Sequence, residues 1–421
     1  MKKRILNKLL CMVLAVSLAA LLAACGGKPG QESTPGSQEA QSTPEQKPSE
    51  TKNEPSEAEP VPEKLAEILD GEGKRLGAID AASACSAVNG GVFYSVVDMK
   101  EYALTGTARY RFFRAADGKD VLLGTLEEQS YEAFYARTEL DGTVYTLATE
   151  GNPFDDRPDT LWLLAFDPSA ESMTKHEVSK YGFPYASMAA ADGKLLIMNH
   201  EMSSPKSDKV YEFDPKTAAV REILSLPDDG TSSLRGIAAA EDGFYLLRLR
   251  LAGGLPEEML LDRYDSTGKL QETLSLNGMI VPAMKDLPGF EGEDDVLIEF
   301  GLNASGFAVQ DGRYLFYENF GRIRVTADLV TGEALFAEED LWSMANGSGE
   351  PAFFEIAFAP YGAGEGPRIV HLQDGKLQTL PFRPDDGSLM LRSASCSADG
   401  TWLIRTVSDA GDDKLFLWKA N

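Results

Sequence analysis

Short runs of apolar residues, in which large side chains alternate with polar or small ones, follow one another from about residue 63 to the end of the chain. The runs are rich in Val, Ile, Leu, Tyr and Phe and are separated by two-residue turn signals. Alternation with a period of two is typical of β-strands. Because no amphipathic helix of convincing length interrupts the pattern, we predict an all-β domain over residues 63–421.

One turn signal recurs along this region at intervals of about 50 residues, which indicates a structural repeat. In each copy an Asn-Gly or Asp-Gly pair stands between a strand of small residues and a strand of large apolar residues. Such pairs permit the tight reversal of a β-hairpin. The copies are Asn89-Gly90, Asp141-Gly142, Asp192-Gly193, Asp242-Gly243, Asp311-Gly312 and Asp399-Gly400.

The second half of each repeat is a further hairpin, as in Phe166-Asp167-Pro168 and Phe213-Asp214-Pro215. Four strands, A to D, in about 50 residues form one blade of a β-propeller. Division of the length predicts seven blades, with six and eight as alternatives because the region from Pro351 to Phe382 is the least regular. The Phe-Asp-Pro and Asp-Gly-Lys-Leu patterns resemble the blades of bacterial propellers of the quinoprotein-like and kelch-like kind.

The last repeat lacks its fourth strand, because the chain ends at Asn421 soon after the apolar strand Lys414 to Trp418. A short strand near Lys74 to Ile79 precedes the first complete repeat. We predict that this N-terminal strand closes the ring, which would remove an open sheet edge.

Two cysteines, Cys85 and Cys396, fall within the predicted domain, and each begins a Cys-Ser-Ala sequence just before a turn. One interpretation is that both are buried small side chains. The other is a disulfide between the innermost strands of the first and last blades, which disulfide-permitting surroundings outside the cytoplasm would allow.

The first 24 residues have the three parts of a secretory signal: a basic start with Lys2, Lys3 and Arg4, an uncharged apolar run, and small residues at its end. Leu22-Ala23-Ala24-Cys25 resembles the lipobox of bacterial lipoprotein precursors. That resemblance implies cleavage before Cys25 and lipidation of its side chain. We therefore expect an extracytoplasmic protein attached to the cell membrane by a lipid anchor.

Residues 25–62 differ in composition from the rest, with recurrent Pro, Ser, Glu and Gln and no aromatic residue. Such a segment cannot bury enough apolar surface to offset its ordering entropy, so we predict a disordered tether. Without residues 1–24 the chain has 40 − 4 = 36 basic and 66 acidic residues, a formal charge of −30. This charge excludes nucleic acid as a natural partner, since nucleic acids require a basic surface. We expect a monomer.

No motif in the sequence identifies a catalytic, metal or cofactor site. Ser-x-x-Lys matches at Ser203 and Ser266 lie between predicted strands, where the helix that presents such a nucleophile cannot form. The histidines His176, His200 and His371 stand in separate repeats and have no metal-ligand spacing. We expect neither a metal nor a cofactor.

The predicted connections are unequal in length, which favours one face of the propeller for binding. The A–B and C–D turns are tight, whereas irregular segments at 149–159, 200–208, 251–257, 277–295 and 338–351 fall on the other connections. Long loops on a rigid scaffold are the usual place for ligand contacts. The candidate ligand-binding residues are Phe154, Asp155, Asp156, Arg157, His200, Phe290, Trp342 and Tyr361.

These patterns favour a tethered binding or scaffold module that recognises a peptide, an envelope protein or a glycan on this face. The first alternative is a carbohydrate-active hydrolase or lyase that acts on a wall polysaccharide at the propeller mouth, through two carboxylates with separated pKa values. The second is a structural spacer without a specific ligand.

Overall fold

The chain divides into two units, residues 1–60 and residues 61–421. The structure, a computed structural model, describes parts of the second unit only, which are residues 64–70, 75–80, 82–98, 107–116, 118–129, 131–132, 137–150, 159–182, 186–201, 207–227, 229–288, 290, 292–300, 304–319, 323–338, 342–356, 368–373, 375–380, 390–407 and 413–419. The predictions for residues 1–24, for Cys25 and for the tether lie outside this range.

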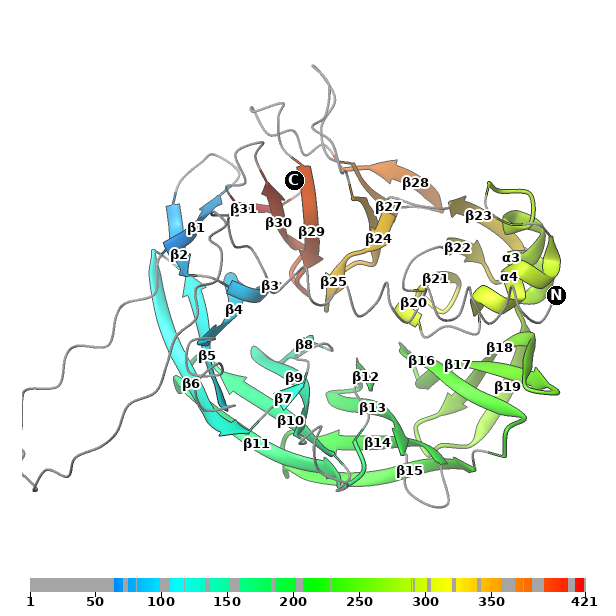
Figure 1. Cartoon of the computed structure of the whole chain (residues 1–421), viewed down its shortest axis with the longest axis horizontal. Helices are drawn as coiled ribbons and strands as arrows, with labels where there is room; N and C mark the ends of the chain where they lie inside the picture. The colour runs from blue at the N-terminus through cyan, green and yellow to red at the C-terminus, as the bar shows by residue number, and fades with distance from the viewer. Residues whose placement is uncertain are drawn as a thin grey trace, which may run out of the picture. The chain divides into compact units, whose positions relative to one another are not determined.

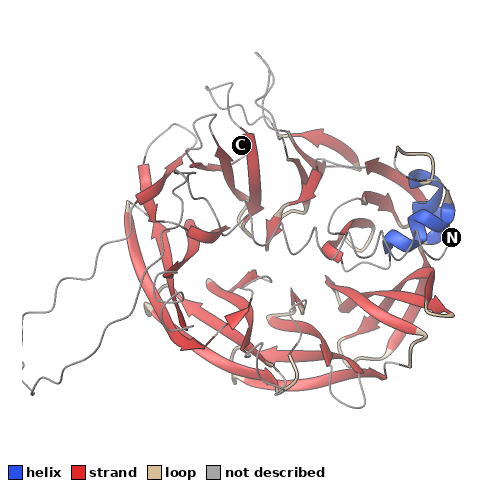
Figure 2. Ribbon diagram, in the orientation of Figure 1, coloured by secondary structure: helices blue, strands red, loops and turns tan. Residues whose placement is uncertain are grey.

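Seven antiparallel sheets stand in a ring, as the strand pattern predicts, and strand A of each sheet is innermost (Figures 1 and 2). Blade 1 consists of β3 (Ala82–Val88), β4 (Gly91–Asp98), β5 (Thr107–Ala116) and β6 (Lys119–Gln129). Blade 2 consists of β7 (Tyr131–Glu132) and β8 (Arg137–Leu140), which share the innermost position, then β9 (Thr143–Glu150), β10 (Thr160–Asp167) and β11 (Ser172–Ser179). Blade 3 consists of β12 (Ser187–Ala191), β13 (Lys194–Glu201), β14 (Ser207–Asp214) and β15 (Ala219–Pro227).

The next three sheets repeat this order. Blade 4 consists of β16 (Ser232–Ala240), β17 (Gly243–Ala252), β18 (Leu255–Asp265) and β19 (Leu270–Ser275). Blade 5 consists of β20 (Ala304–Gln310), β21 (Tyr314–Asn319), β22 (Arg324–Asp328) and β23 (Glu333–Glu338). Blade 6 consists of β24 (Trp342–Met344), β26 (Ala352–Glu355), β27 (Ile369–Gln373) and β28 (Lys376–Thr379).

Blade 7 combines the two ends of the domain. Its strands β29 (Met390–Cys396), β30 (Thr401–Val407) and β31 (Asp413–Lys419) are followed by β1 (Lys64–Asp70), which pairs with β31 in parallel. β2 (Arg75–Asp80) pairs with β1 only. Closure by an N-terminal strand is therefore confirmed, but the strand predicted near Lys74 to Ile79 is the wrong one, since it lies one position further out.

Three of the Asp-Gly turns close their A–B hairpins with both residues at positive φ. Asp141 and Gly142 have φ angles of 50° and 78°, and Asp192 and Gly193 have 51° and 69°. Two successive residues at positive φ define the turn whose twist matches that of the flanking strands, and Asp-Gly tolerates it well. The turn chemistry thus fixes the repeat.

The hydrophobic core is divided among the spaces between neighbouring blades. Between blades 1 and 2, Phe166 lies 4.9 Å from Phe93 and 4.7 Å from Phe112, measured between ring centroids. All three rings are fully buried. Since each sheet packs both faces against its neighbours, middle strands such as β10 read as nearly continuous apolar runs, and the ring is held together by these interfaces.

In the part of the chain that the structure describes, two helices interrupt the β pattern, which the sequence did not predict. α3 (Asn277–Met284) and α4 (Glu293–Phe300) occupy the connection from blade 4 to blade 5, at the right of Figures 1 and 2. Met279, Ile280 and Met284 are buried in the cluster that joins the two blades. The predicted irregular loop over 277–295 is therefore wrong, because its apolar residues cover the core between two blades.

A short strand that the sequence did not predict lies between β24 and β26. β25 (Asn346–Gly347) pairs in parallel with Ser395 and Cys396 of β29, so part of the segment predicted to be irregular over 338–351 is strand. Gly347 has a φ of 139°, and a Cβ atom there would lie 2.0 Å from the carbonyl oxygen of Cys396. Only glycine permits this approach.

The two cysteines point into different interfaces. Cys85 packs against the cluster between blades 7 and 1, whereas Cys396 is 2% exposed in the cluster between blades 6 and 7. Cys396 is a free thiol, and burial raises its pKa to about 11. Of the two interpretations, this arrangement favours two separate thiols over a disulfide. Cys85 stands four positions before its turn residue Asn89, whereas Cys396 stands three positions before Asp399, and a shift of one position turns a side chain to the opposite face of the strand.

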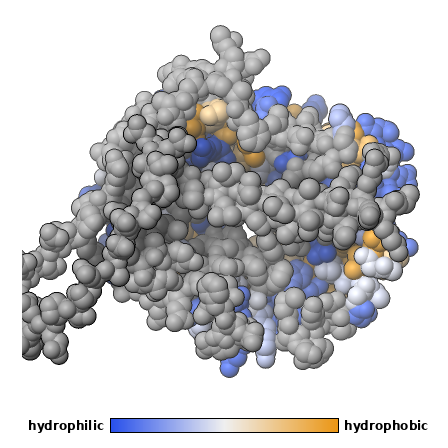
Figure 3. Space-filling view, viewed as in Figure 1, coloured by the Kyte–Doolittle hydropathy of each residue, from blue (hydrophilic) through white to orange (hydrophobic). Residues whose placement is uncertain are grey.

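The outer surface of the ring carries few large apolar side chains in the described parts of the chain. Leu255 on β18 and Ile298 on α4 are 62% and 45% exposed. Figure 3 shows hydrophobic residues reaching the surface on the right of the view, where Figure 1 places blade 4 and the helices. Among the described helices, neither has the length and apolar composition that crossing a membrane requires.

Candidate functional site

The connections on the two ends of the blades differ in length. The A–B and C–D connections are tight hairpins in most blades, such as Asp141–Gly142, and we call this end the turn face. The B–C and D–A connections, which we call the loop face, include 99–106, 151–159, 276–303, 356–368 and 380–389 between described strands. The predicted asymmetry is present, with two exceptions. β17 and β18 continue to a tight turn at Gly253–Gly254, so the irregular segment predicted at 251–257 is wrong. Residues 345–351 of the segment predicted at 338–351 form the A–B connection of blade 6 and lie on the turn face.

Most of the predicted ligand-binding residues cannot be placed. Phe154, Asp155, Asp156, Arg157 and Tyr361 lie outside the described residues. Trp342 begins β24, but its side chain also lies outside the described part.

Phe290 is placed, and its predicted role is wrong. Its ring is 9% exposed and belongs to the core cluster between blades 4 and 5. It therefore stabilises the connection between α3 and α4 instead of facing a ligand.

His200 joins two blades. Its Nδ1 lies 2.6 Å from Oδ1 of Asp208, and Oδ2 of Asp208 accepts the backbone N–H of Leu234 at 2.7 Å. His200 and Asp208 belong to blade 3, and Leu234 lies on the innermost strand of blade 4. With 9% exposure, His200 acts as part of an inter-blade brace.

The same kind of brace recurs around the ring, with a side chain of one blade accepting a backbone N–H from the innermost strand of its neighbour. Oε2 of Glu318 accepts Met344 N–H at 2.6 Å, and Oγ of Ser395 accepts Ala87 N–H at 2.7 Å. A buried N–H without a partner costs about 1–3 kcal/mol. These side chains therefore provide hydrogen-bond acceptors for backbone N–H groups of the innermost strands, where the blades converge.

A larger polar cluster lies at the loop face between blades 2 and 3. We call it the loop-face cluster, and it consists of Ser179, Glu201, Lys209, Tyr211 and Glu222. The buried carboxylate of Glu201 is its centre: it accepts hydrogen bonds from Ser179 Oγ at 2.6 Å and from the Tyr211 hydroxyl, and it pairs with Lys209 Nζ at 3.0 Å. Lys209 also pairs with Glu222 at 2.9 Å.

The electrostatics of this cluster fix its protonation. Burial alone would raise the pKa of Glu201, but the hydrogen bonds from Ser179, Tyr211 and Lys209 outweigh it and hold the pKa below its ordinary value. Burial, and then the bond to Glu201, raise the pKa of Tyr211 to about 12. Burial would lower the pKa of Lys209, but its carboxylate partners raise it. Glu201 and Lys209 are thus charged and Tyr211 neutral near pH 7, which suits a structural role better than proton transfer.

The loop-face cluster holds an exposed aromatic residue in place. Tyr181 donates its backbone N–H to Ser179 Oγ at 3.1 Å, and its carbonyl accepts Asn199 Nδ2 at 2.9 Å. The Tyr181 side chain is 40% exposed. The next residue, Gly182, packs so closely on β10 that a Cβ atom would lie 2.8 Å from Leu161 N. A rigid backbone therefore presents this ring to solvent.

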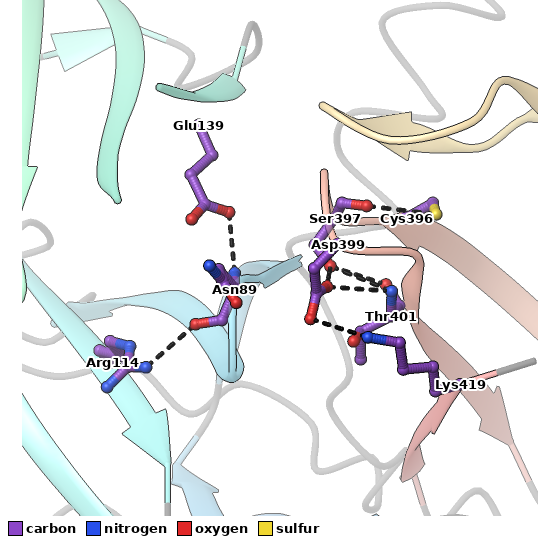
Figure 4. Close-up of polar contacts among 8 residues, drawn as sticks. All are labelled: Asn89, Arg114, Glu139, Cys396, Ser397, Asp399, Thr401 and Lys419. Atoms are coloured by element: carbon purple, nitrogen blue, oxygen red, sulfur yellow. Dashed lines mark hydrogen bonds and ion pairs between the residues drawn. The ribbon is translucent and has the colours of Figure 1, made fainter. Parts of the chain in front are cut away.

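A second polar cluster lies on the turn face, where blades 7, 1 and 2 meet (Figure 4). Glu139 of blade 2 accepts the backbone N–H of Asn89 in blade 1 at 2.8 Å, and the Asn89 carbonyl accepts Arg114 Nη2 at 3.0 Å. In blade 7, Asp399 accepts Ser397 Oγ at 2.5 Å and the backbone N–H of Thr401 at 3.1 Å. Lys419 lies 3.4 Å from the same carboxylate.

The two carboxyl groups of this turn-face cluster have opposite pKa shifts. Burial raises the pKa of Glu139, and the negative charge of Asp399 adds to the increase. Burial would also raise the pKa of Asp399, but hydrogen bonds from Ser397 and Thr401 hold it below its ordinary value. Two carboxyl groups whose pKa values are shifted in opposite directions are found in catalytic acid–base pairs. Hydrogen bonds that only join neighbouring blades produce the same shifts.

Sequence reasoning missed both clusters because it selected residues in connections, whereas these residues stand in or beside strands. One signal was present: the apolar strand from Leu195 ends in Asn199, His200 and Glu201, and Asp208 and Lys209 begin the next strand. Polar residues at adjoining strand ends indicate a buried network. Within the described residues, no group of three or more His, Cys, Asp or Glu is arranged to hold a metal ion.

No protein-family model and no curated protein matches the sequence. Solved structures are similar in fold. The β-propeller domain of the Trilobed protease from Pyrococcus furiosus has 13% identity, a TM-score of 0.40, and coverage of 69% of this chain and 84% of that one. A chain of the mitotic checkpoint complex has 12% identity, a TM-score of 0.42, and coverage of 89% and 99%. A periplasmic gluconolactonase of Pseudomonas aeruginosa has 14% identity, a TM-score of 0.41, and coverage of 73% and 90%.

Proposed function

We propose that this propeller is a membrane-tethered, extracytoplasmic binding or scaffold module that recognises a peptide, an envelope protein or a glycan on its loop face. The observation that carries the proposal is the asymmetry of the connections: tight turns at one end of the blades and long connections at the other. Braced strands beneath long connections give a rigid scaffold with variable contacts, which is the usual design of a recognition surface.

The exposed ring of Tyr181 supports this reading. A tyrosine supplies a large contact area at a low cost in side-chain entropy, which makes it a frequent anchor of peptides and sugars. Here the cost is reduced further, because Ser179 and Asn199 already hold the backbone on both sides. Preorganisation of this kind increases affinity without adding a contact.

Tyr181→Ala is expected to weaken binding at least tenfold, because a large preorganised contact on the loop face is lost. The folded state should be nearly unaffected, since the side chain is 40% exposed. Binding is measured by co-sedimentation of the full chain with insoluble cell-wall polysaccharide and by titration on a peptide array.

Val330→Ala is the matched control. Val330 is 74% exposed in the turn between β22 and β23, so the substitution removes exposed apolar area from the turn face and leaves the loop face unchanged. Equal losses in the two variants, or no binding to either probe, would contradict the proposal.

A carbohydrate-active hydrolase is the second candidate, and the opposite pKa shifts of Glu139 and Asp399 favour it. Cleavage of the sedimented polysaccharide that disappears in Glu139→Gln would select this candidate over the binding module.

The anchor is a separate part of the proposal and rests on Leu22-Ala23-Ala24-Cys25. Cys25→Ala is expected to move the protein from the membrane to the soluble fraction or to leave the signal uncut, because stable attachment needs the acyl chains. Fractionation and gel mobility measure both outcomes. A variant that fractionates and migrates like the wild type would show that Cys25 is not lipidated.

A further inference from the structure

The innermost strands share an irregularity near their loop-face ends. In four blades the pairing of strand A with strand B skips one residue close to the start of strand A, which is the mark of a β-bulge. The skipped residues are Ser83 in β3, Arg235 in β16, Ser305 in β20 and Arg392 in β29. Bulges redirect side chains and are frequent beside binding sites. Because each lies near the start of its strand, the four bulges stand at a similar level of the ring.

Two of the four extra residues are arginines. Arg392 is exposed, although its neighbour Leu391 and the nearby Ala394 are buried in the blade interfaces. On an innermost strand whose two faces are covered by other blades, the central channel and its mouth are the remaining open directions. Arg235 is half-buried, with Nη1 3.4 Å from the carbonyl oxygen of Leu234. Blades 4 and 7 stand on opposite sides of the ring (Figure 1).

The charge of these strands differs from that of the protein. The chain has 66 acidic and 40 basic residues. In the described parts of the innermost strands, by contrast, basic residues outnumber acidic ones: the basic residues are Arg137, Arg235 and Arg392, and the acidic residues are Glu132 and Glu139. Glu139 lies on the turn face, where it binds Asn89 N–H. Arg137 lies in the interface with blade 1, where its Nη1 is 3.4 Å from Ser86 Oγ and its guanidinium covers the Phe93 ring. At the loop-face end Arg235 and Arg392 therefore outnumber the one acidic residue, Glu132. Walls of low dielectric constant strengthen such a local field.

We propose that the central channel binds a small carboxylate-bearing ligand at its loop-face end, with Arg235 and Arg392 as the residues that contact it. The guanidinium group matches a carboxylate by two parallel hydrogen bonds and stays charged when partly buried. Asp208 accepts the backbone N–H of Leu234, the residue before Arg235, and its charge would disfavour a doubly charged phosphate more than a singly charged carboxylate. This inference rests on the proposed function for the face from which the ligand enters, and it names the ligand's chemistry.

D-glucuronate and D-glucose are suitable probes, because they differ only in the carboxylate. Titration calorimetry on the full chain in detergent should show binding of glucuronate and none of glucose. Arg392→Gln and Arg235→Gln should each weaken glucuronate binding at least tenfold, and Arg235→Lys should restore part of it. Arg221→Gln, which removes the same charge from the outermost strand β15 where the side chain is 60% exposed, should leave the affinity within twofold.

Equal binding of the two sugars, or equal losses in Arg221→Gln and Arg392→Gln, would overturn the proposal. Inorganic phosphate that binds more tightly than glucuronate would overturn the ligand class. Should Arg235→Gln fail to fold, the exposed Arg392 decides the question. Loss of glucuronate binding in Arg392→Gln, with wall-polysaccharide binding intact, separates this site from the loop-face surface. If glucuronate does not bind but Tyr181→Ala still weakens polysaccharide or peptide binding, the channel proposal is wrong and the proposed function of the loop face is retained.

Discussion

Removal of residues 1–70 is expected to lower the thermal midpoint strongly or to prevent folding, whereas removal of residues 1–60 should leave the midpoint nearly unchanged. The first deletion takes away β1, which completes blade 7, and the second ends at the boundary of the compact unit. Circular dichroism on heating measures the midpoints, and size-exclusion chromatography measures association.

The physical reason is the ladder that joins Ala66–Asp70 to Asp413–Leu417. Each backbone hydrogen bond contributes about 0.5–1.5 kcal/mol net, so the ladder is worth several kcal/mol. That is a large part of the about 5–15 kcal/mol by which a domain is usually stable. Loss of β1 also leaves β31 as an open edge, and such edges pair with other chains.

A single substitution makes the same test without shortening the chain. Ile68 pairs with Leu415 in the middle of the ladder, and Ile68→Pro removes a donor and a backbone conformation that the strand needs. Midpoints that do not differ between the 1–60 and 1–70 deletions, together with an unaffected Ile68→Pro variant, would show that β1 does not close the ring.

The repeat was predictable because it depends on local turn chemistry. Asp141-Gly142 and Asp192-Gly193 adopt the positive φ angles that few other pairs tolerate, so the turn residues alone mark the A–B hairpins. Seven blades and N-terminal closure follow from the spacing of these turns and from the missing last strand. The choice between β1 and β2 as the closing strand does not follow, because two adjoining strands of similar length compete for one edge.

Long-range pairing accounts for the other errors in the fold. β25 is too short to leave a strand pattern, and it exists because Ser395 and Cys396 offer it a partner from another blade. α3 contains Pro282 and lacks a side-chain cap, so its local helix propensity is weak. Burial of its apolar residues against blades 4 and 5 stabilises the helix instead. In both cases tertiary contacts override local preference.

The candidate site was predictable only as a face. Unequal connection lengths identified the loop face, but the residues singled out there were chosen for being aromatic or charged, and Phe290 proved to be a core residue. Glu201 and Tyr211 form their network across two strands, and Ser179 joins from the neighbouring blade. A single sequence does not show which strand ends meet between blades.

Glu201→Ala is expected to lower the free energy of unfolding by about 3 kcal/mol, among the largest effects of any single substitution in this chain. Removal of one member of a buried charged network leaves its partners unsatisfied, and that costs more than the net value of the pair. The partners affected here are the Lys209 ammonium and the hydroxyls of Ser179 and Tyr211. Urea unfolding at pH 7, followed by tryptophan fluorescence, measures the change.

Glu222→Ala provides the control, because Glu222 pairs with the same Lys209 but is 45% exposed, so its loss should cost less than about 1 kcal/mol. Acid gives a second check. Since the pKa of Glu201 is lowered in the folded state, its contribution is complete above the unfolded pKa and is lost as pH falls through the folded pKa. The difference between wild type and Glu201→Gln should therefore be full at pH 7 and shrink below about pH 4. A difference that is constant with pH, or a cost of Glu222→Ala equal to that of Glu201→Ala, would mean that the charge of Glu201 does not hold blades 2 and 3 together.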